Sequence, residues 1–115
     1  MERSLRLLIV EDEICLRRSI ARYFELCGLE VTEAGSVLEA SRHLDAGDFD
    51  AVVLDIGLPD GDGLSLLPRT QARRSVVLTA NPDSARLASS GVIRHLAKPV
   101  DLRELRSAVE AASFA

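Results

Sequence analysis

The chain has 115 residues, enough for one domain with a single hydrophobic core that needs no disulfide or metal staples. Its composition, 47% hydrophobic and 28% charged, is that of an ordinary globular protein. The formal net charge of −4 argues against nucleic acid or an anionic membrane as a direct partner, and a cationic partner surface or a divalent metal fits better.

The first segment, MERSLRLLIVEDE at residues 1–13, has basic residues before a short apolar run that ends on three acids. A signal peptide needs a longer apolar stretch, so we predict a strand here and a cytoplasmic protein. Cys15 and Cys27 stand twelve positions apart on one predicted helix, roughly 18 Å at 1.5 Å per residue, too far for a disulfide. Free thiols agree with a reducing cytoplasm.

Five short apolar runs alternate with helix-like segments along the chain. The runs lie at residues 5–10, 29–32, 51–54, 76–78 and 92–97. They are rich in β-branched residues, as expected for strands that are buried on both faces. This alternation predicts an α/β fold in three layers, with a parallel sheet between two layers of helices.

The helix-like segments have recognisable start and stop signals. Ser36 with Glu39, and Asp101 with Glu104, have the spacing of helix N-terminal capping pairs. The Asn-Pro pair at residues 81–82 predicts the N-cap and first residue of a fourth helix. Glycines follow three of the segments and predict their ends: Gly28, Gly47 and Gly91.

Polar residues follow four of the predicted strands at the point where each strand ends. Glu11 and Asp12 follow the first strand, Asp55 the third, Thr79 the fourth and Lys98 the fifth. Ligands bind beyond the carboxyl ends of the strands of an open parallel sheet. We therefore expect three acids, one hydroxyl and one ammonium to converge on one edge, although they are spread from position 11 to position 98.

This set of groups suits phosphoryl transfer to a carboxylate. Three clustered acids repel one another and favour a hard divalent cation such as Mg²⁺, which prefers carboxylate oxygens. Lys98 can stabilise charge on the transferring group, and Thr79 can donate a hydrogen bond to it. A carboxylate nucleophile then yields an acyl phosphate.

Four motifs carry a family resemblance. They are an acidic pair after the first strand (LLIVEDE), an aspartate followed by proline and an Asp-Gly pair (VVLDIGLPDGDG), a strand that ends in a hydroxyl (VVLTA), and a lysine–proline pair (HLAKPV). Together they resemble the receiver domain of bacterial two-component response regulators, over essentially the whole chain, residues 1–115. The resemblance implies a flavodoxin-like fold with five parallel strands in the order 2-1-3-4-5.

The resemblance also implies a role for each strand-end residue. Asp55 is expected to accept the phosphoryl group, with Thr79 as the switch hydroxyl and Lys98 as the phosphoryl anchor. Magnesium, with manganese as a substitute, is expected to bind Asp55, Asp12 directly, Glu11 largely through water, and the backbone carbonyl of Gly57. The peptide bond between Lys98 and Pro99 is expected to be cis.

Two features depart from the family pattern. His95 occupies the position three residues before the lysine, where the family usually has an aromatic switch residue, so its movement would respond to pH near neutrality. The alternative is a histidine that is not coupled to Thr79. The spacings from Asp55 to Thr79 and on to Lys98 are also short, which predicts trimmed third and fourth helices. Because proline breaks or kinks a helix interior, Pro68 predicts either a short, kinked third helix or one that starts late, with Pro68 in its first turn.

The remaining charged residues have simpler interpretations. Asp60 and Asp62 lack the spacing and closing glutamate of a calcium loop, so we expect them in a turn and helix entry. Glu13 is expected at a helix N-terminus, where the dipole favours an acid. Arg17 and Arg18 are expected on a solvated helix face, with contact to a kinase as the alternative.

The resemblance implies a phosphorylation-controlled signalling switch and no enzyme. The expected partners are a sensor histidine kinase or a histidine phosphotransfer protein, an unidentified output domain or protein, and a second copy bound through the fourth helix, fifth strand and fifth helix. The chain would be either a free-standing receiver or one cut from a longer regulator.

Three alternatives remain at this point. A degenerate receiver would act as an interaction module without phosphorylation. A phosphatase of the haloacid dehalogenase class needs a second acid two positions after the nucleophile, where this chain has Gly57. A flavodoxin needs a hydroxyl- and glycine-rich phosphate loop after the first strand, and the sequence there is EDEICLRR.

Overall fold

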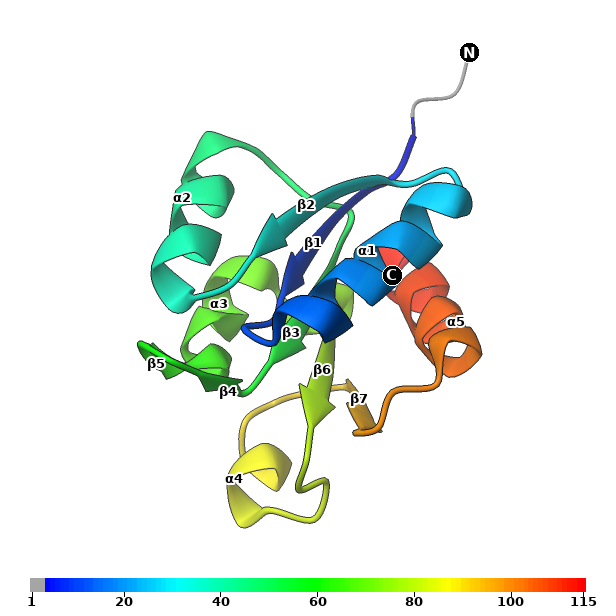
Figure 1. Cartoon of the computed structure of the whole chain (residues 1–115). Helices are drawn as coiled ribbons and strands as arrows, with labels where there is room; N and C mark the ends of the chain where they lie inside the picture. The colour runs from blue at the N-terminus through cyan, green and yellow to red at the C-terminus, as the bar shows by residue number, and fades with distance from the viewer. Residues whose placement is uncertain (1–3) are drawn as a thin grey trace.

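A computed structural model describes residues 4–115, so the first three residues of the predicted domain lie outside the described residues. Within it, five parallel strands form one sheet in the order β2-β1-β3-β6-β7 (Figure 1). Because β4 and β5 form a separate small hairpin, this is the predicted order 2-1-3-4-5. The strands are β1 Arg6–Val10, β2 Glu30–Ala34, β3 Ala51–Asp55, β6 Ser75–Thr79 and β7 Arg94–Ala97.

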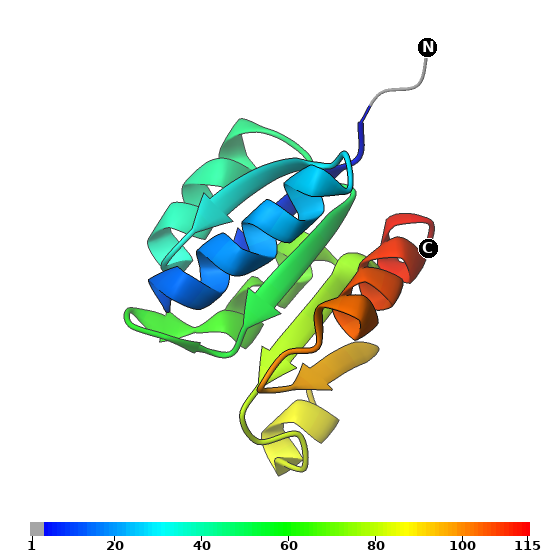
Figure 2. The ribbon, with the colours of Figure 1, turned by 45° about the vertical axis from the view of Figure 1, so that its right-hand side comes forward.

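Helices cover both faces of the sheet and connect its strands. They are α1 Ile14–Leu26, α2 Val37–Ala46, α3 Leu67–Thr70, α4 Ala85–Ala88 and α5 Leu102–Ser113. Helices α1 and α5 pack on one face, α2 and α3 pack on the other, and the short α4 lies past the carboxyl end of β6 (Figures 1 and 2). None of the helices in residues 4–115 is long and apolar enough to cross a bilayer.

The hydrophobic core is divided by the sheet into two halves. Alternate residues of a strand point to opposite faces. On β1, Leu7 and Ile9 therefore join the buried residues beneath α1 and α5, whereas Leu8 and Val10 join those beneath α2 and α3. All four side chains are fully buried, so β1 is fixed from both faces and the acids that follow it are held in place.

The prediction that every strand is buried on both faces is correct for the centre of the sheet and wrong for its edges. Strands β3 and β6 are buried at every residue, and β1 at every residue except its first. Strand β7 instead alternates between half-buried and exposed residues, and β2 is mostly half-buried. Each of these two has only one neighbouring strand in the sheet.

Most predicted helix ends are confirmed. The side chains of Glu13, Ser36 and Asp101 accept hydrogen bonds from backbone N–H groups in the first turns of α1, α2 and α5. Gly28, just after α1, has a φ of +92°, which favours glycine. Pro68 lies in the first turn of α3, which follows a 3₁₀ turn at Gly63–Leu66, so the late-starting alternative is correct.

The predicted start of the fourth helix is wrong. Asn81 does not cap it, because the N-cap is Ser84, whose hydroxyl accepts from the backbone N–H of Leu87 at 3.1 Å. The carbonyl of Asn81 accepts from the N–H of Ser84, and its own N–H donates to the Thr79 hydroxyl, so this segment forms a turn. Helices α3 and α4 have four residues each, as the short spacings predicted.

Candidate functional site

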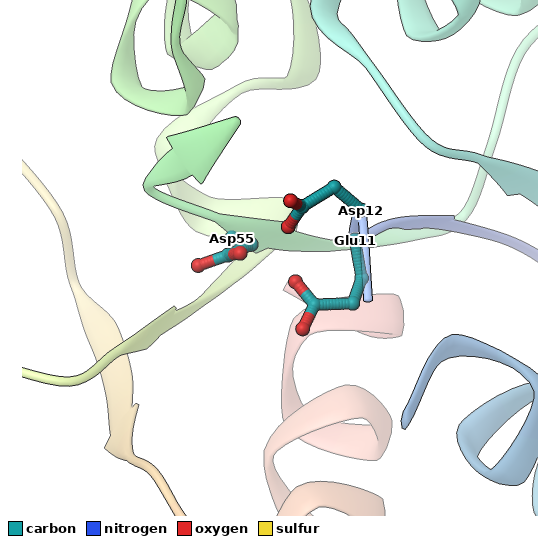
Figure 3. A group of neighbouring side chains, drawn as sticks. All are labelled: Glu11, Asp12 and Asp55. Atoms are coloured by element: carbon teal, nitrogen blue, oxygen red, sulfur yellow. The ribbon is translucent and has the colours of Figure 1, made fainter. Parts of the chain in front are cut away.

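Three acids from two strand ends converge at the carboxyl edge of the sheet. Asp55 is the last residue of β3, and Glu11 and Asp12 directly follow β1, the strand beside it. One carboxylate oxygen from each lies within 4.8 Å of the others. Figure 3 shows the side chains of Glu11 and Asp12 extending toward Asp55. The predicted cluster is therefore present, and the sheet register holds it, because Val10 pairs with Leu54 immediately before the acids.

Glu11 is the most deeply buried of the three acids. Its side chain is fully buried, whereas Asp12 is exposed and Asp55 is 5% exposed. Burial, together with the neighbouring carboxylate of Asp55, raises the pKa of Glu11 to about 8, although Lys98 acts in the opposite direction. Its Oε2 atom has no hydrogen-bond partner among residues 4–115. A buried carboxylate oxygen without a partner fits a hard cation that would complete its coordination.

Lys98 places a positive charge inside the acidic cluster. Lys98 directly follows β7. Its Nζ lies 2.9 Å from Glu11 Oε1 and 3.2 Å from Asp55 Oδ2. Partial burial lowers the pKa of Lys98, but the hydrogen bond to Glu11 and the charge of Asp55 outweigh burial, so the pKa lies above its usual value. The ammonium therefore stays charged. It contacts residues at the ends of β1 and β3 from its own position after β7. The peptide bond between Lys98 and Pro99 is cis, as predicted.

Thr79 ends β6, the strand next to β3. Leu78 pairs with Asp55, so the hydroxyl of Thr79 follows one residue beyond the aspartate. The residue is only 5% exposed, and its Oγ1 accepts from the backbone N–H of Asn81 at 3.0 Å. The hydroxyl proton is left to donate to another acceptor, and this is the capacity that a phosphoryl oxygen would use.

The loop after Asp55 depends on Gly63 for its close approach to the end of β3. A Cβ atom built at Gly63 would lie 1.9 Å from the carbonyl oxygen of Asp55, so only glycine fits there. The N–H of Gly63 also donates to the carbonyl of Ile56 at 2.8 Å, which fixes the loop to the end of β3. At Gly57, by contrast, nothing lies within 4 Å of a built Cβ. In the sequence, Gly63 is one glycine of a DGDG run, and nothing local separates its role from that of its neighbours.

Gly57 belongs to a small hairpin that follows Asp55 in the chain. Strands β4 (Gly57–Leu58) and β5 (Gly61–Asp62) pair antiparallel, and the N–H of Gly57 donates to Asp55 Oδ1 at 3.4 Å. Asp62 caps the 3₁₀ turn that follows, which confirms the predicted helix entry, and it also forms an ion pair with Arg86 of α4.

Asp60 has a further role that the sequence did not indicate. Its two carboxylate oxygens accept from the backbone N–H groups of Leu38 and Val37, so it caps α2 from 22 and 23 positions away. These hydrogen bonds, from Leu38 and then Val37, hold the pKa of Asp60 below its ordinary value. The hairpin after β3 is thereby tied to α2.

The prediction of a solvated Arg17 is wrong. Its Nε donates to Glu33 at 3.1 Å and its Nη1 donates to the backbone carbonyl of Glu11, also at 3.1 Å. The side chain is 19% exposed, because α1 lies against the ends of β1 and β2. Arg17 therefore supports the backbone of a cluster residue. Arg18 is 71% exposed, as predicted, and is 3.8 Å from Glu33.

His95 lies apart from the acidic cluster. It is an exposed residue of β7 that pairs in register with Val77, and it lines an open crevice of about 350 Å³ together with Leu87 of α4 and Val92. Among the residues predicted for the site, the structure brings together Glu11, Asp12, Asp55 and Lys98, with Thr79 ending the strand next to Asp55, and it does not bring His95 to them.

A protein-family comparison agrees with this arrangement. The family model of the response regulator receiver domain matches residues 7–110. The chain belongs to the response regulator receiver domain family. The swarming motility regulation protein RssB of Serratia marcescens is 36% identical over 114 residues, which cover 93% of this chain and 52% of RssB. The receiver domain thus spans about half the length of that relative.

Solved receiver structures share the fold. A CheY-like receiver domain from Methanospirillum hungatei has a TM-score of 0.86 and 25% identity, and the match covers 97% of this chain and 95% of that one. TrrA of Thermotoga maritima, a response regulator solved in complex with Mg(2+)-BeF, has a TM-score of 0.81 and 26% identity over 94% of this chain and 98% of its own. The flavodoxin-like receiver fold that the resemblance implied is therefore confirmed.

Proposed function

We propose that this receiver domain is a switch controlled by phosphorylation of Asp55 in a Mg²⁺-dependent reaction. One observation carries the proposal: the Asp55 carboxylate lies 3.2 Å from the Lys98 ammonium and faces the two acids that follow β1. This arrangement places a nucleophile, a positive charge and a site suited to a hard cation together at the carboxyl edge of the sheet. The complex of TrrA with Mg(2+)-BeF supports the choice of metal.

In this proposal each residue has a separate task. A carboxylate oxygen of Asp55 attacks the phosphorus of the donor and forms an acyl phosphate, as the donor's own bond to phosphorus breaks and its histidine (or acetate, from acetyl phosphate) leaves. Lys98 stabilises charge on the transferred group. Asp12 would hold Mg²⁺ directly, Glu11 would hold it largely through water, and the carbonyl of Gly57 would add a further oxygen. When bound, the metal reduces the repulsion between an anionic phosphoryl donor and the attacking carboxylate.

The proposed output is a population shift at the far strands. The Thr79 hydroxyl donates to the phosphoryl group, and the turn that bonds to Thr79 through Asn81 moves with it. This turn leads into α4, beside the crevice that His95 lines. We place the response to phosphorylation there, with His95 in the switch role and this face as a dimer or partner contact.

The proposed donor is a sensor histidine kinase or a histidine phosphotransfer protein in the cytoplasm. The receiver acts as a signalling domain that performs one transfer on itself, without turnover of a separate substrate. The output would come from another region or another protein, consistent with a relative about twice as long.

The test is phosphorylation by acetyl phosphate with Mg²⁺, followed by intact-protein mass spectrometry. The wild type should gain one phosphoryl group with Mg²⁺ present and gain none when EDTA is added before the acetyl phosphate. Asp55→Asn should gain none. Asp60→Asn is the matched control, because Asp60 is an exposed aspartate of the following loop that caps α2, and this variant should be labelled. Labelling of Asp55→Asn would refute the assignment.

A second measurement separates this switch from a degenerate receiver. Beryllofluoride with Mg²⁺ should move the amide resonances of Thr79 and His95 in the wild type and leave them in place in Asp55→Asn. If the amides near Asp55 shift while those at Thr79 and His95 stay fixed, the domain binds the phosphoryl mimic without switching. Steady hydrolysis of a model phosphate ester would instead indicate a phosphatase.

A further inference from the structure

A second cavity lies at the opposite, amino end of the sheet. It has a volume of about 740 Å³ and lies where β1 and β3 begin, between the loop after α2 and the segment after α3. In Figure 1 this end lies opposite the strand arrowheads. Three arginines from different parts of the chain line it: Arg6, Arg69 and Arg74. None of them has a role in the proposed phosphoryl transfer.

Arg74 contributes a buried donor without a partner. Only two buried side-chain polar atoms in residues 4–115 lack a hydrogen-bond partner, and they are Glu11 Oε2 and Arg74 Nε. An unsatisfied buried donor costs about 1–3 kcal/mol, so such atoms are normally completed by water or a ligand. The first of the two belongs to the acidic cluster, where a cation fits. The second belongs to the cationic side chain of Arg74, a residue that lines the cavity.

The other two arginines are only partly engaged. Arg69 Nη2 bonds to Asp45 at 2.5 Å, and Arg6 Nη1 donates to the carbonyl of Asp48 at 2.8 Å. A guanidinium has five donors, so N–H groups remain on both. Asp48 and Asp50 also line the cavity, and Glu30 and Asp45 lie against Arg6 and Arg69. The arginine left for a ligand is therefore Arg74, which forms no ion pair within residues 4–115.

The segment that carries Arg74 is held rigidly. The hydroxyls of Thr70 and Ser75 are hydrogen-bonded at 2.7 Å and both residues are buried, and the Ser75 hydroxyl donates to the carbonyl of Gln71 at 2.6 Å. Gln71 has a φ of +68°, in the left-handed region that residues other than glycine rarely adopt. Such strained positions persist where the surrounding structure fixes them, and they concentrate at ligand sites.

We propose that this cavity is a binding site for a compact, multiply charged oxyanion, with Arg74 as its central contact. A guanidinium offers paired donors that match two oxygens of a phosphate or carboxylate group. The ring of Phe49, which also lines the cavity, is 9% exposed, and Arg6 lies 5.0 Å from its centroid. The ring is therefore not available to stack on a base, and the ligand is recognised through its charge.

This site is separate from the phosphoacceptor. Strand β6 begins at Ser75, directly after Arg74, and ends at Thr79, so about 13 Å of strand lies between the two ends at about 3.3 Å per residue. An anion bound at Arg74 does not overlap Asp55 or Lys98. The site consequently does not depend on the proposed phosphorylation, and Asp55→Asn should bind the anion as the wild type does.

The test is an amide-resolved NMR titration of the metal-free protein at constant ionic strength. The probes are methylenediphosphonate and, separately, citrate, which distinguish phosphate-type from carboxylate recognition. Saturable shifts are expected in residues 47–50 and 69–75. Arg74→Met should weaken binding at least tenfold. Arg73→Met is the matched control, because Arg73 is an exposed arginine one position earlier that does not line the cavity, and it should stay within twofold.

Three outcomes would overturn the proposal. Shifts confined to the carboxyl edge would mean that the probes bind Lys98 alone. Equal weakening by Arg73→Met and Arg74→Met would mean diffuse electrostatic attraction, and shifts that never saturate would mean no site. Both variants should keep wild-type spectral dispersion. Arg69→Met is a second cavity variant and should also weaken binding, so a misfolded Arg74→Met would still leave a decisive comparison.

Discussion

The two ends of the sheet carry opposite charges, and they hold those charges in different ways. At the carboxyl end, Glu11 and Asp55 are buried strand-end residues, and Lys98 reaches into the space between them. At the amino end, Arg6 and Arg69 are half-exposed side chains, each beside an acid of a neighbouring segment.

The difference shows what burial does to like charges. Strand register forces the two buried acids together, so their repulsion must be offset by a proton on Glu11, by Lys98 or by a cation. At the other end, Arg6 and Arg69 are partly exposed to solvent and each lies beside an acid, so no bound proton or cation is needed to offset their charge. We therefore expect changes at the carboxyl end to alter stability and its pH dependence, and changes at the amino end to alter ligand binding alone.

The largest effect is expected from Gly63→Ala, which would disturb the carboxyl end directly. The new methyl carbon would meet the Asp55 carbonyl oxygen at 1.9 Å, so the loop or the end of β3 must move. Overpacking of this kind typically costs about 1–3 kcal/mol, and both contacting groups here are backbone or directly attached to it. Urea unfolding should show a lower midpoint, and acetyl phosphate should label the variant more slowly.

Gly57→Ala is the matched control for that change. Its Cβ would have no atom within 4 Å, and the carbonyl proposed for the metal is retained. Its unfolding free energy should stay within about 0.5 kcal/mol of the wild type, as is usual for exposed positions. Equal stability of the two variants would mean that the loop relaxes freely around Gly63.

Glu11→Gln should change how stability depends on pH. The pKa of Glu11 is about 8 in the folded protein and near its ordinary value of 4.5 when unfolded. Between these values the folded state keeps a proton that the unfolded state has lost, so wild-type stability falls as pH rises from about 4.5 to 8. Glutamine has no proton to lose, so in EDTA the variant should gain on the wild type by more than about 1 kcal/mol across this window.

Magnesium provides the control for the Glu11 prediction. A cation favours the ionised carboxylate. Saturating Mg²⁺ should therefore reduce the slope of unfolding free energy against pH in the wild type and leave that slope unchanged in the variant. Urea unfolding at several pH values, with and without the metal, measures both. Parallel pH profiles for wild type and variant in EDTA would show that Glu11 is already ionised in the folded state.

Features set by local chemistry could be predicted from the sequence. The five strands are found within three residues of their predicted ends, and the caps at Ser36 and Asp101 are as expected. The acidic cluster was also predictable, because parallel strands bring their carboxyl ends to one edge whatever their separation in the chain. The position of the cluster follows from the topology of the sheet alone, without knowledge of side-chain contacts.

Features set by contacts between distant segments could not be predicted. Arg17 lies in a helix that reads as amphipathic, and only the position of α1 beside β1 makes the Glu11 carbonyl its acceptor. Asn81 has good capping chemistry, but its N–H bonds to the Thr79 hydroxyl and the helix starts later, at Ser84. Gly63 requires a backbone approach from Asp55, eight residues earlier, that no local signal reveals.

The smallest stability effect is expected from Arg74→Met at the amino end of the sheet. Its Nε–H has no partner among the described residues, so a methionine removes a buried donor that forms no hydrogen bond and keeps most of the apolar stem. Urea unfolding should show no loss of stability greater than about 0.5 kcal/mol relative to the wild type at any pH between 5 and 8. A loss as large as that expected for Gly63→Ala would mean that Arg74 is a structural residue, with its donors completed by bound water. If Arg74→Met keeps its stability and loses oxyanion binding, the two ends differ as proposed. Charges at the carboxyl end then affect the stability of the fold, and charges at the amino end affect ligand binding.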